Sequence, residues 1–319
     1  MRNSKVRWRG ALVRVGTVSA VSLWRSLRRL GGVGGPRTSG PHPPHPPAAA
    51  PAVDSGAGET PAQRAAWLER TLREYVETLG ADHPRSIAAR NNLASKYAQI
   101  GRREAAVEQF ERALADAVAA LGEEHSQTDV IRENLALCYE DARRFDEAGA
   151  QWEVLLQQRQ HRLGATAAET VTARSRLAHA YRRTGRPDAA VAHYERAIED
   201  STGAPAEELE NLRIGLGRAY RSAGRLDDTV QQLRMVLAQR RRRLGARHHD
   251  SLVVHHRLAR AYREAGRFAE GIEELEAAYR HCLAAAGDPE VRMLAMRVRR
   301  DLAGAYRAAG RPRDAAALY

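Results

Sequence analysis

The sequence predicts an all-α protein built from stacked helical hairpins, and three observations support this fold class. Helix-forming Ala, Leu, Arg and Glu dominate the 319 residues, while aromatic residues make up only 5%. A Leu followed four residues later by Tyr recurs at intervals of 39 to 44 residues. Four residues after each of these tyrosines comes a glycine, or Arg143 in one case, and the next residue is always Arg, a pattern that indicates a turn. A repeat of this length is typical of supersecondary units that stack on one another.

The chain begins with a segment of different composition. Residues 1–60 hold nine Lys and Arg but only two acids, Asp54 and Glu59, so they carry +7 of the +12 formal net charge. Residues 1–35 are rich in Arg and contain several glycines, which favours a basic, disordered tail. Residues 36–60 are rich in Pro, Gly and Ala, a composition that indicates a semi-rigid linker.

A second interpretation of residues 1–35 is a segment that docks on an anionic membrane surface. Arg7, Arg14 and Arg25 recur at spacings that would place them on one stripe of a helix. The chain has no run of 18 apolar residues, so we expect no helix that crosses a bilayer. We expect a cytoplasmic protein under either interpretation.

Residues 61–319 are expected to fold as a lone helix near 61–79 followed by about six hairpins. Because residues four apart share one face of a helix, each Leu–Tyr pair marks the apolar stripe of a first helix. These pairs are Leu93/Tyr97, Leu135/Tyr139, Leu177/Tyr181, Leu216/Tyr220, Leu258/Tyr262 and Leu302/Tyr306. The hairpins are expected near residues 85–121, 127–163, 169–200, 207–244, 250–286 and 290–319, with the last incomplete.

A turn is expected four residues after each Tyr. The residue there is glycine in five hairpins and Arg143 in the second, and the next residue is always Arg. Glycine at this place takes the left-handed conformation that ends many helices. Arg143 is expected to adopt the same conformation or to distort the turn, at a cost of about 1 kcal/mol.

The second helix of each hairpin shows a small residue and then a large apolar one, five and nine positions after the turn. In the sixth hairpin these are Ala315 and Tyr319. We expect second helices to end in the same way at Gly122, Gly164, Gly245 and Gly287. The last residue, Tyr319, falls midway through a second helix, so Leu302 and Tyr306 should lack most of their cover. Self-association there, or continuation as a longer array, is therefore expected.

The repeat resembles the tetratricopeptide repeat, in the longer-period form of kinesin light chains. The residues that carry the resemblance are Leu-Gly-Ala-Asp-His-Pro at 79–84, Arg-Asn-Asn-Leu-Ala at 90–94, Tyr97 to Arg102, and Phe-Glu-Arg-Ala-Leu at 110–114. The resemblance implies a right-handed α-α superhelix that serves as a protein-interaction scaffold. It also implies that the first helices line a concave groove.

Groove positions are expected on the face of each first helix that points away from its Leu and Tyr. The candidates are Asn92, Asn134, Arg176, His179, Arg183, Arg218, Arg257 and Arg260. Asn side chains suit the backbone amides of an extended peptide, and guanidinium groups suit carboxylates. We therefore expect a protein or peptide partner with an acidic segment. The alternative is that these arginines bind no partner and only form a solvated face of an arginine-rich chain.

Other functional classes find less support in the sequence. His248, His249, His255 and His256 form the one histidine cluster, but His248 matches His83 and His125, where the related repeats have a helix-start residue. We expect no catalytic residues, no metal and no cofactor, because no constellation of catalytic side chains or phosphate-binding loop is present. Nucleic acid is an unlikely partner, because the tyrosines are assigned to the core. A non-catalytic regulatory module of a larger signalling protein stays open.

Overall fold

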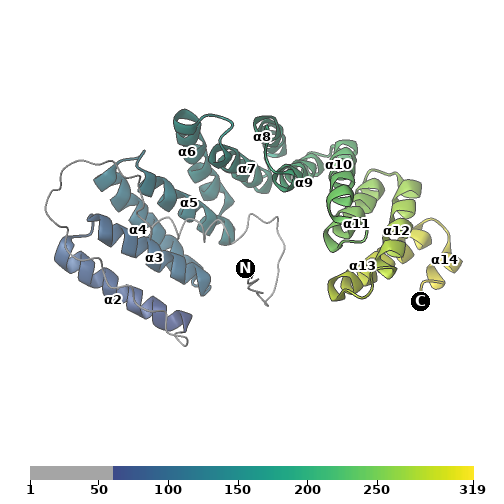
Figure 1. Ribbon diagram of the computed structural model, residues 1–319, viewed down its shortest axis with the longest axis horizontal. Coiled ribbons are helices and arrows are strands. Elements are labelled where there is room, and N and C mark those ends of the chain that lie inside the picture. The colour runs from purple at the N-terminus through teal and green to yellow at the C-terminus, as the bar shows by residue number, and fades with distance from the viewer. Residues whose placement is uncertain (1–59) are drawn as a thin grey trace, which may run out of the picture. The chain divides into compact units, whose positions relative to one another are not determined.

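The computed structural model describes residues 60–319, and these residues form thirteen helices and no strand (Figure 1). The predicted all-α class is therefore confirmed for this part of the chain. The predicted tail (1–35) and all of the linker except Thr60 lie outside the described residues. The chain divides into two compact units, residues 1–134 and 135–319, with the boundary inside α5 (Ser126–Asp141).

The first unit contains α2 (Pro61–Leu79), α3 (Pro84–Gln99), α4 (Arg103–Leu121) and the start of α5. Thr60 caps α2 through a capping box with Gln63. His83 Nδ1 accepts a hydrogen bond of 3.1 Å from the backbone N–H of Arg85 at the start of α3. Helix α3 packs against both α2 and α4, and Ile87, Leu93 and Phe110 are almost fully buried in this unit.

The second unit continues from α5 through nine further helices. They are α6 (Phe145–Leu163), α7 (Ala168–Arg183), α8 (Pro187–Asp200), α9 (Ala206–Ser222), α10 (Leu226–Leu244), α11 (His249–Glu264), α12 (Phe268–Leu283), α13 (Pro289–Ala308) and α14 (Pro312–Ala316). From α6 onward each helix packs against the next, and α7 also contacts α9, as α11 contacts α13. The helices α7, α9, α11 and α13 are first helices of hairpins in this unit. Among them, α7 lies beside α9 and α11 lies beside α13.

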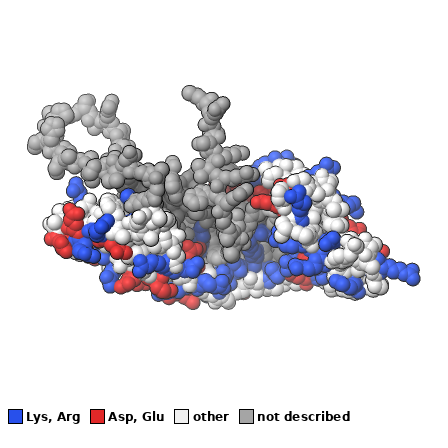
Figure 2. Space-filling view, turned by 90° about the horizontal axis from the view of Figure 1, so that it is seen from below, with Lys and Arg blue, Asp and Glu red and all other residues white. Residues whose placement is uncertain are grey.

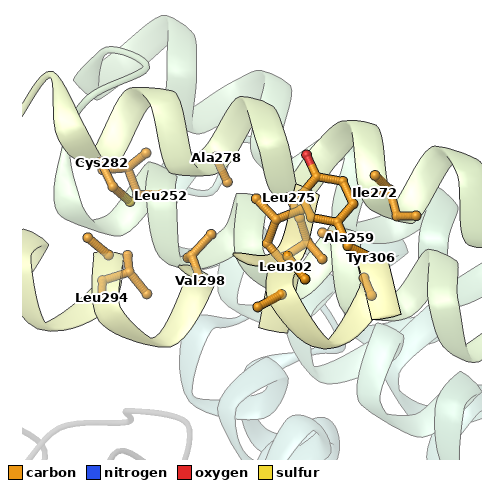
Figure 3. Close-up of a cluster of buried hydrophobic side chains, with 14 of the residues drawn as sticks. Leu252, Ala259, Ile272, Leu275, Ala278, Cys282, Leu294, Val298, Leu302 and Tyr306 are labelled. Carbon is orange, nitrogen blue, oxygen red and sulfur yellow. The ribbon is translucent and has the colours of Figure 1, made fainter. Parts of the chain in front are cut away.

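The predicted Leu–Tyr stripes form the core. All six leucines are at most 3% exposed, and five of the six tyrosines are at most 8% exposed. At the end of the chain, Leu302 and Tyr306 of α13 lie against α11 and α12 in one apolar cluster with Leu252 and Leu275 (Figure 3). Burial of large apolar side chains of this kind contributes about 1.5–3 kcal/mol each.

Each first helix ends in a turn that satisfies its last carbonyl groups. Gly101, Gly185, Gly224, Gly266 and Gly310 all have φ between 71° and 81°, and Arg143 has φ 63°. The backbone N–H of the following arginine donates to the tyrosine carbonyl in all six turns, at 2.8–2.9 Å. This is the Schellman arrangement, in which the residue after the left-handed one bonds back over five positions. The predicted left-handed conformation of Arg143 is confirmed.

The turn arginine also covers the tyrosine side chain. In every hairpin its guanidinium lies over the ring of that tyrosine, 4.2–4.7 Å from the centroid. The tyrosine hydroxyl then donates to a glutamate on the preceding second helix at 2.5–2.7 Å, in the pairs Tyr97–Glu69, Tyr181–Glu153, Tyr220–Glu195 and Tyr306–Glu276. We call this set of three side chains the turn clasp. In these four turns it ties the turn to the preceding second helix.

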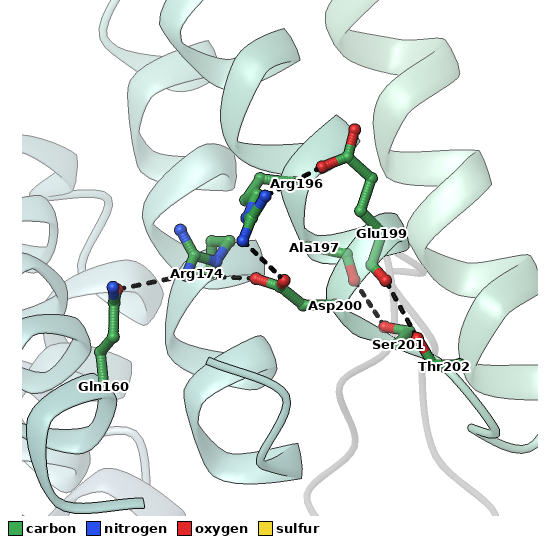
Figure 4. A network of polar contacts seen from close by, with 8 residues as sticks. All are labelled: Gln160, Arg174, Arg196, Ala197, Glu199, Asp200, Ser201 and Thr202. Carbon is green, nitrogen blue, oxygen red and sulfur yellow. Dashed lines mark hydrogen bonds and ion pairs between the residues drawn. The ribbon is translucent and has the colours of Figure 1, made fainter. Parts of the chain in front are cut away.

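A buried polar network joins three helices around the short second helix α8 (Figure 4). Arg174 of α7 lies 3.3 Å from Asp200 at the end of α8 and donates a hydrogen bond of 3.2 Å to Gln160 of α6. Arg196 reaches the other oxygen of Asp200 at 3.2 Å. The carboxylate of Asp200 thus neutralises a buried guanidinium, which would otherwise be costly to desolvate.

Three sequence predictions near the C-terminal end were wrong. Gly287 does not end α12, because the helix stops at Leu283 and closes through two tight bonds, from Ala285 N–H to Cys282 O and from Ala286 N–H to Leu283 O. Tyr319 is 75% exposed, since α14 spans only five residues and does not carry the helical register to the end. Leu302 and Tyr306 do not lack cover, because the preceding hairpin buries them.

The turn clasp is expected to stabilise the junctions where it is complete. Tyr220 donates to Glu195, whereas Arg234 stands at the corresponding position for Tyr262, whose hydroxyl makes no hydrogen bond with the described residues. Tyr220→Phe should therefore lower the free energy of unfolding by about 1–2 kcal/mol, because it removes a bond to a charged acceptor. Tyr262→Phe is the matched control and should cost much less. Urea unfolding followed by helical circular dichroism measures both, and equal losses would contradict the clasp.

Candidate ligand-binding surface

Successive first helices in the second unit bring arginine-rich faces next to one another. Helix α7 packs beside α9, and α11 packs beside α13. Between these pairs, Arg221 Nε of α9 lies 2.6 Å from Glu264 Oε2 of α11. Basic side chains are spread over the face seen in the space-filling view, with acidic ones between them (Figure 2). Two groups of arginines on the first helices concentrate this charge.

The first group, the α7–α9 cluster, consists of Arg176, His179, Arg182 and Arg183 of α7 and Arg218 of α9. Arg176 Nη1 is 2.8 Å from Glu140 Oε2, and the other oxygen of that carboxylate accepts from Trp152 Nε1 at 2.8 Å. The Arg176 side chain is only 11% exposed. This sequence-predicted site residue is therefore engaged inside the unit rather than facing solvent.

His179 sits at the centre of this cluster in a strongly basic environment. Burial, followed by the charges of Arg182, Arg176, Arg183 and Arg218, lowers its pKa to about 3. The imidazole therefore stays neutral at physiological pH. Its ring meets Phe145 edge-on at 6.0 Å between centroids, and the guanidinium of Arg183 lies 3.9 Å above the same phenylalanine. Four of the sequence-predicted residues, Arg176, His179, Arg183 and Arg218, thus come together here.

The second group lines a cleft of about 410 Å³ between α11 and α13, which we call the α11–α13 cleft. It contains five arginines and one acid. The lining residues are Val253, His256, Arg257, Arg260 and Arg263 of α11 and Leu294, Arg297, Arg300 and Asp301 of α13. Arg257 and Arg260 were both predicted from sequence as groove residues, and the structure brings them into one cleft.

Asp301 is already engaged by two side chains of this cleft. Its Oδ2 is 2.8 Å from His256 Nε2, and its Oδ1 is 4.0 Å from Arg300 Nε. Burial lowers the pKa of His256 and outweighs the opposing effect of Asp301, while the nearby Arg260 and Arg297 lower it further. A neutral His256 then donates its Nε2 proton to Asp301. The carboxylate is held in place, and the surrounding guanidiniums keep an excess of positive charge.

The two sequence-predicted asparagines belong to the first unit and are placed differently from one another. Asn134 is fully buried, and its Nδ2 donates to Asn91 Oδ1 at 3.0 Å. The prediction that Asn134 reaches a partner's backbone is therefore corrected, because its amide bridges two helices of this unit. Asn92 is half-buried. It remains a candidate only by its position on α3.

The histidine cluster has structural roles. His248 caps α11 by accepting a hydrogen bond from the backbone N–H of Asp250 at 3.2 Å. His255 is buried and lies 2.6 Å from Glu274 on α12. Within residues 60–319 no group of three or more His, Cys, Asp or Glu is arranged to hold a metal ion. No helix of the same residues is both long and apolar enough to span a membrane.

The sequence prediction named only Arg257 and Arg260 of the nine residues that line the α11–α13 cleft, and those it left out include His256 and Arg300. Both stand two positions before the repeat leucine, at Leu258 and Leu302. The predicted groove positions did not include the one two residues before the leucine, although that position borders the predicted face on a helical wheel. A wider arc on that wheel would have included both residues.

Comparison with known protein families decides what this repeat is. A family model described as tetratricopeptide repeat matches residues 65–117, 121–201 and 208–284, which is more than half of the chain. The chain belongs to the tetratricopeptide repeat family. Proteins of this family generally serve as protein-interaction scaffolds, so the predicted family and fold class are confirmed. The search against curated protein sequences found no significant relative.

Solved structures show the same tetratricopeptide fold in its kinesin-light-chain form. A Podosopora anserina protein named as a kinesin light chain, with nearly identical TPR-like repeats, is 25% identical, with a TM-score of 0.59. The match covers 65% of this chain and 99% of that chain. BtubC (BKLC) from P. vanneervenii is 20% identical with a TM-score of 0.57, and the match covers 72% of this chain and 94% of that chain. These likenesses support the longer-period form of the repeat.

The low pKa of His179 predicts an acid-sensitive second unit. In the unfolded chain this histidine takes up a proton near pH 6.5, whereas in the folded state it does so only near pH 3. The contribution of neutral His179 to the free energy of unfolding is complete above pH 6.5. It is lost as the pH falls toward 3, by about 1.4 kcal/mol per pH unit. Urea unfolding at pH 7.5, 5.5 and 4.5 should show a shallower pH dependence for His179→Gln than for the wild type. Parallel profiles would contradict this placement of His179.

Proposed function

We propose that the second unit binds an extended acidic segment of a partner protein along the first-helix faces of α7, α9, α11 and α13. The observation that carries the proposal is the charge of the α11–α13 cleft, where five arginines surround one already engaged carboxylate. Guanidinium groups grip carboxylates through paired hydrogen bonds, and a concentration of one sign of charge attracts the opposite one. The role is non-catalytic, in keeping with a scaffold family.

The neighbouring α7–α9 cluster extends this basic surface along the chain. Arg218 makes no hydrogen bond or ion pair with the described residues, and its charge contributes to the lowered pKa of His179. A segment that runs from α9 toward α13 would pass Arg218 and then Arg260 and Arg297. Because these side chains come from different hairpins, a partner has to span neighbouring repeats to contact all of them.

Two other partners remain less supported. Docking on a membrane surface would use residues 1–35, which lie outside the described residues. Binding of single-stranded nucleic acid would use exposed aromatic side chains for stacking. The repeat tyrosines instead have their rings under the turn arginines. A cytoplasmic location and a regulatory role in a larger protein stay predictions.

The turn arginines are unsuitable as controls for a binding experiment. Arg186 and Arg267 lie outside the predicted binding face, but each covers a tyrosine ring and closes a turn. Reversing their charge would disturb the fold. Arg242 and Arg247 are better controls, because both are exposed and neither lines the α11–α13 cleft.

Charge reversal on the binding face tests the proposed function. With the full chain and a fluorescein-labelled peptide of Asp, Glu, Ser and Gly, Arg218→Glu combined with Arg260→Glu should raise the Kd by at least about tenfold. The reason is that like charges across an interface repel. Arg242→Glu combined with Arg247→Glu changes the net charge equally and should raise the Kd less than about threefold. Binding should also weaken steeply as salt increases, because exposed charges are screened within about 10 Å at 0.1 M.

Fluorescence polarisation at 0.05 and 0.15 M salt measures both double variants. Circular dichroism confirms that each remains helical. An equal loss of affinity in the two variants would show that net charge, and not the first-helix faces, controls binding.

A further inference from the structure

The α11–α13 cleft offers more positive charge than one peptide carboxylate would neutralise. Asp301 is the one acid among its lining residues, and His256 and Arg300 already contact it. The guanidinium groups of Arg260, Arg263 and Arg297 make no hydrogen bond or ion pair with the described residues. These three arginines line the same cleft as Asp301, so the positive charge of the lining exceeds the negative charge.

The fold holds one of these arginines in a defined position. Gly271 of α12 has no side chain, and a Cβ placed there would lie 2.5 Å from Arg263 Cγ. The stem of Arg263 thus fills the space that a larger residue at position 271 would occupy. The stem of Arg263 therefore packs closely against α12, and the residue also lines the cleft.

We propose that this cleft receives a phosphate monoester carried on a side chain of the bound segment, such as phosphoserine or phosphothreonine. The inference rests on the proposed function and specifies its ligand. A phosphate monoester carries between about −1.5 and −2 charges at pH 7 and presents three acceptor oxygens. Its three oxygens can accept from two or three guanidiniums at once, whereas a carboxylate has only two oxygens and a single negative charge.

Side-chain chemistry and size both favour this ligand. The cationic side chains of the cleft are all arginines, whose planar fork matches two phosphate oxygens, while a lysine would act as a point charge. A volume of about 410 Å³ corresponds to about fourteen water molecules at about 30 Å³ each. That space admits a phosphate together with the side chain that carries it.

The position of the cleft favours a phosphate borne on a polypeptide over a free small molecule. The cleft lies on the first-helix face that already carries the α7–α9 cluster, so a single extended segment could occupy both. Its rim is formed by the exposed side chains of Arg260, Arg297 and Arg300, which leave a bound group open to solvent. A free phosphate compound would gain little enclosure there.

Three labelled peptides test the inference with the full chain in 0.15 M salt. They share one acidic sequence of Asp, Glu, Ser and Gly and differ only at a central residue, which is Ser, Glu or phosphoserine. Fluorescence polarisation should show the phosphoserine peptide binding about tenfold more tightly than the Ser peptide. It should also bind several-fold more tightly than the Glu peptide.

Matched variants locate the effect in the cleft. Arg260→Gln combined with Arg297→Gln should reduce the preference for phosphoserine over Ser to about twofold or less. Arg260→Lys combined with Arg297→Lys keeps the charge but removes the forks, and it should retain only part of the preference. Arg242→Gln combined with Arg247→Gln serves as the control and should leave the preference unchanged.

The outcomes separate this inference from the proposed function. Tight binding of all three peptides with no gain from phosphorylation would overturn the inference and leave the proposed function standing. If no peptide binds but calorimetry detects free phosphoserine or inorganic phosphate in the wild type and not in the double Gln variant, the proposed function and the polypeptide source are both overturned. Inorganic phosphate that competes at the concentration of the phosphopeptide would also overturn the polypeptide source.

Discussion

The turn that joins the two helices of each hairpin is the constraint on which the rest of the structure depends. At this point the backbone must reverse, the last carbonyls of the first helix need donors, and the tyrosine ring needs cover. One arginine meets two of these needs, because its N–H bonds back to the tyrosine carbonyl and its guanidinium lies over the tyrosine ring. Where a glutamate stands on the preceding second helix, the tyrosine hydroxyl links one hairpin to the next. The same geometry therefore fixes the turn within each repeat and the register between repeats.

Arginine consequently has two separate roles in a chain that contains almost no lysine outside its first residues. Arginines of the turns are used by the fold, and so are buried ones such as Arg174, which pairs with Asp200. Arginines on the first-helix faces of α9, α11 and α13 have few acidic partners, and they make the surface basic. A high arginine content alone does not distinguish these roles. The distinction comes from what each guanidinium touches, and it identifies the first-helix faces as the place where a ligand can compete for positive charge.

Much of the fold could be predicted from the sequence because its determinants are local. The period of the Leu–Tyr pairs, the turn glycines and the small residues of the second helices depend on residues close in the chain, and Arg143 took the conformation that its place required.

The site was less predictable, because whether a side chain is available to a ligand depends on its contacts with other helices. Asn134 and Arg176 share the predicted face, yet Asn91 and Glu140 engage them. The glutamates of the turn clasp recur at one position of the second helix, a pattern that acquires meaning only when the tyrosine of the next hairpin is placed beside it. The end of the chain was mispredicted because burial of Leu302 comes from the preceding hairpin.

The central claim is that arginines on the first-helix faces, and not the overall charge, hold an acidic partner. Nuclear magnetic resonance of the arginine Nε–Hε groups in the full chain, with an acidic peptide added to saturation, tests this most directly. We expect large shifts for Arg218, Arg260 and Arg297, because a carboxylate or phosphate would accept hydrogen bonds from their guanidiniums. Arg186, Arg225 and Arg311 should keep their signals, since each already lies over a tyrosine ring. Small shifts spread evenly over all arginines, or shifts confined to the turns, would contradict it.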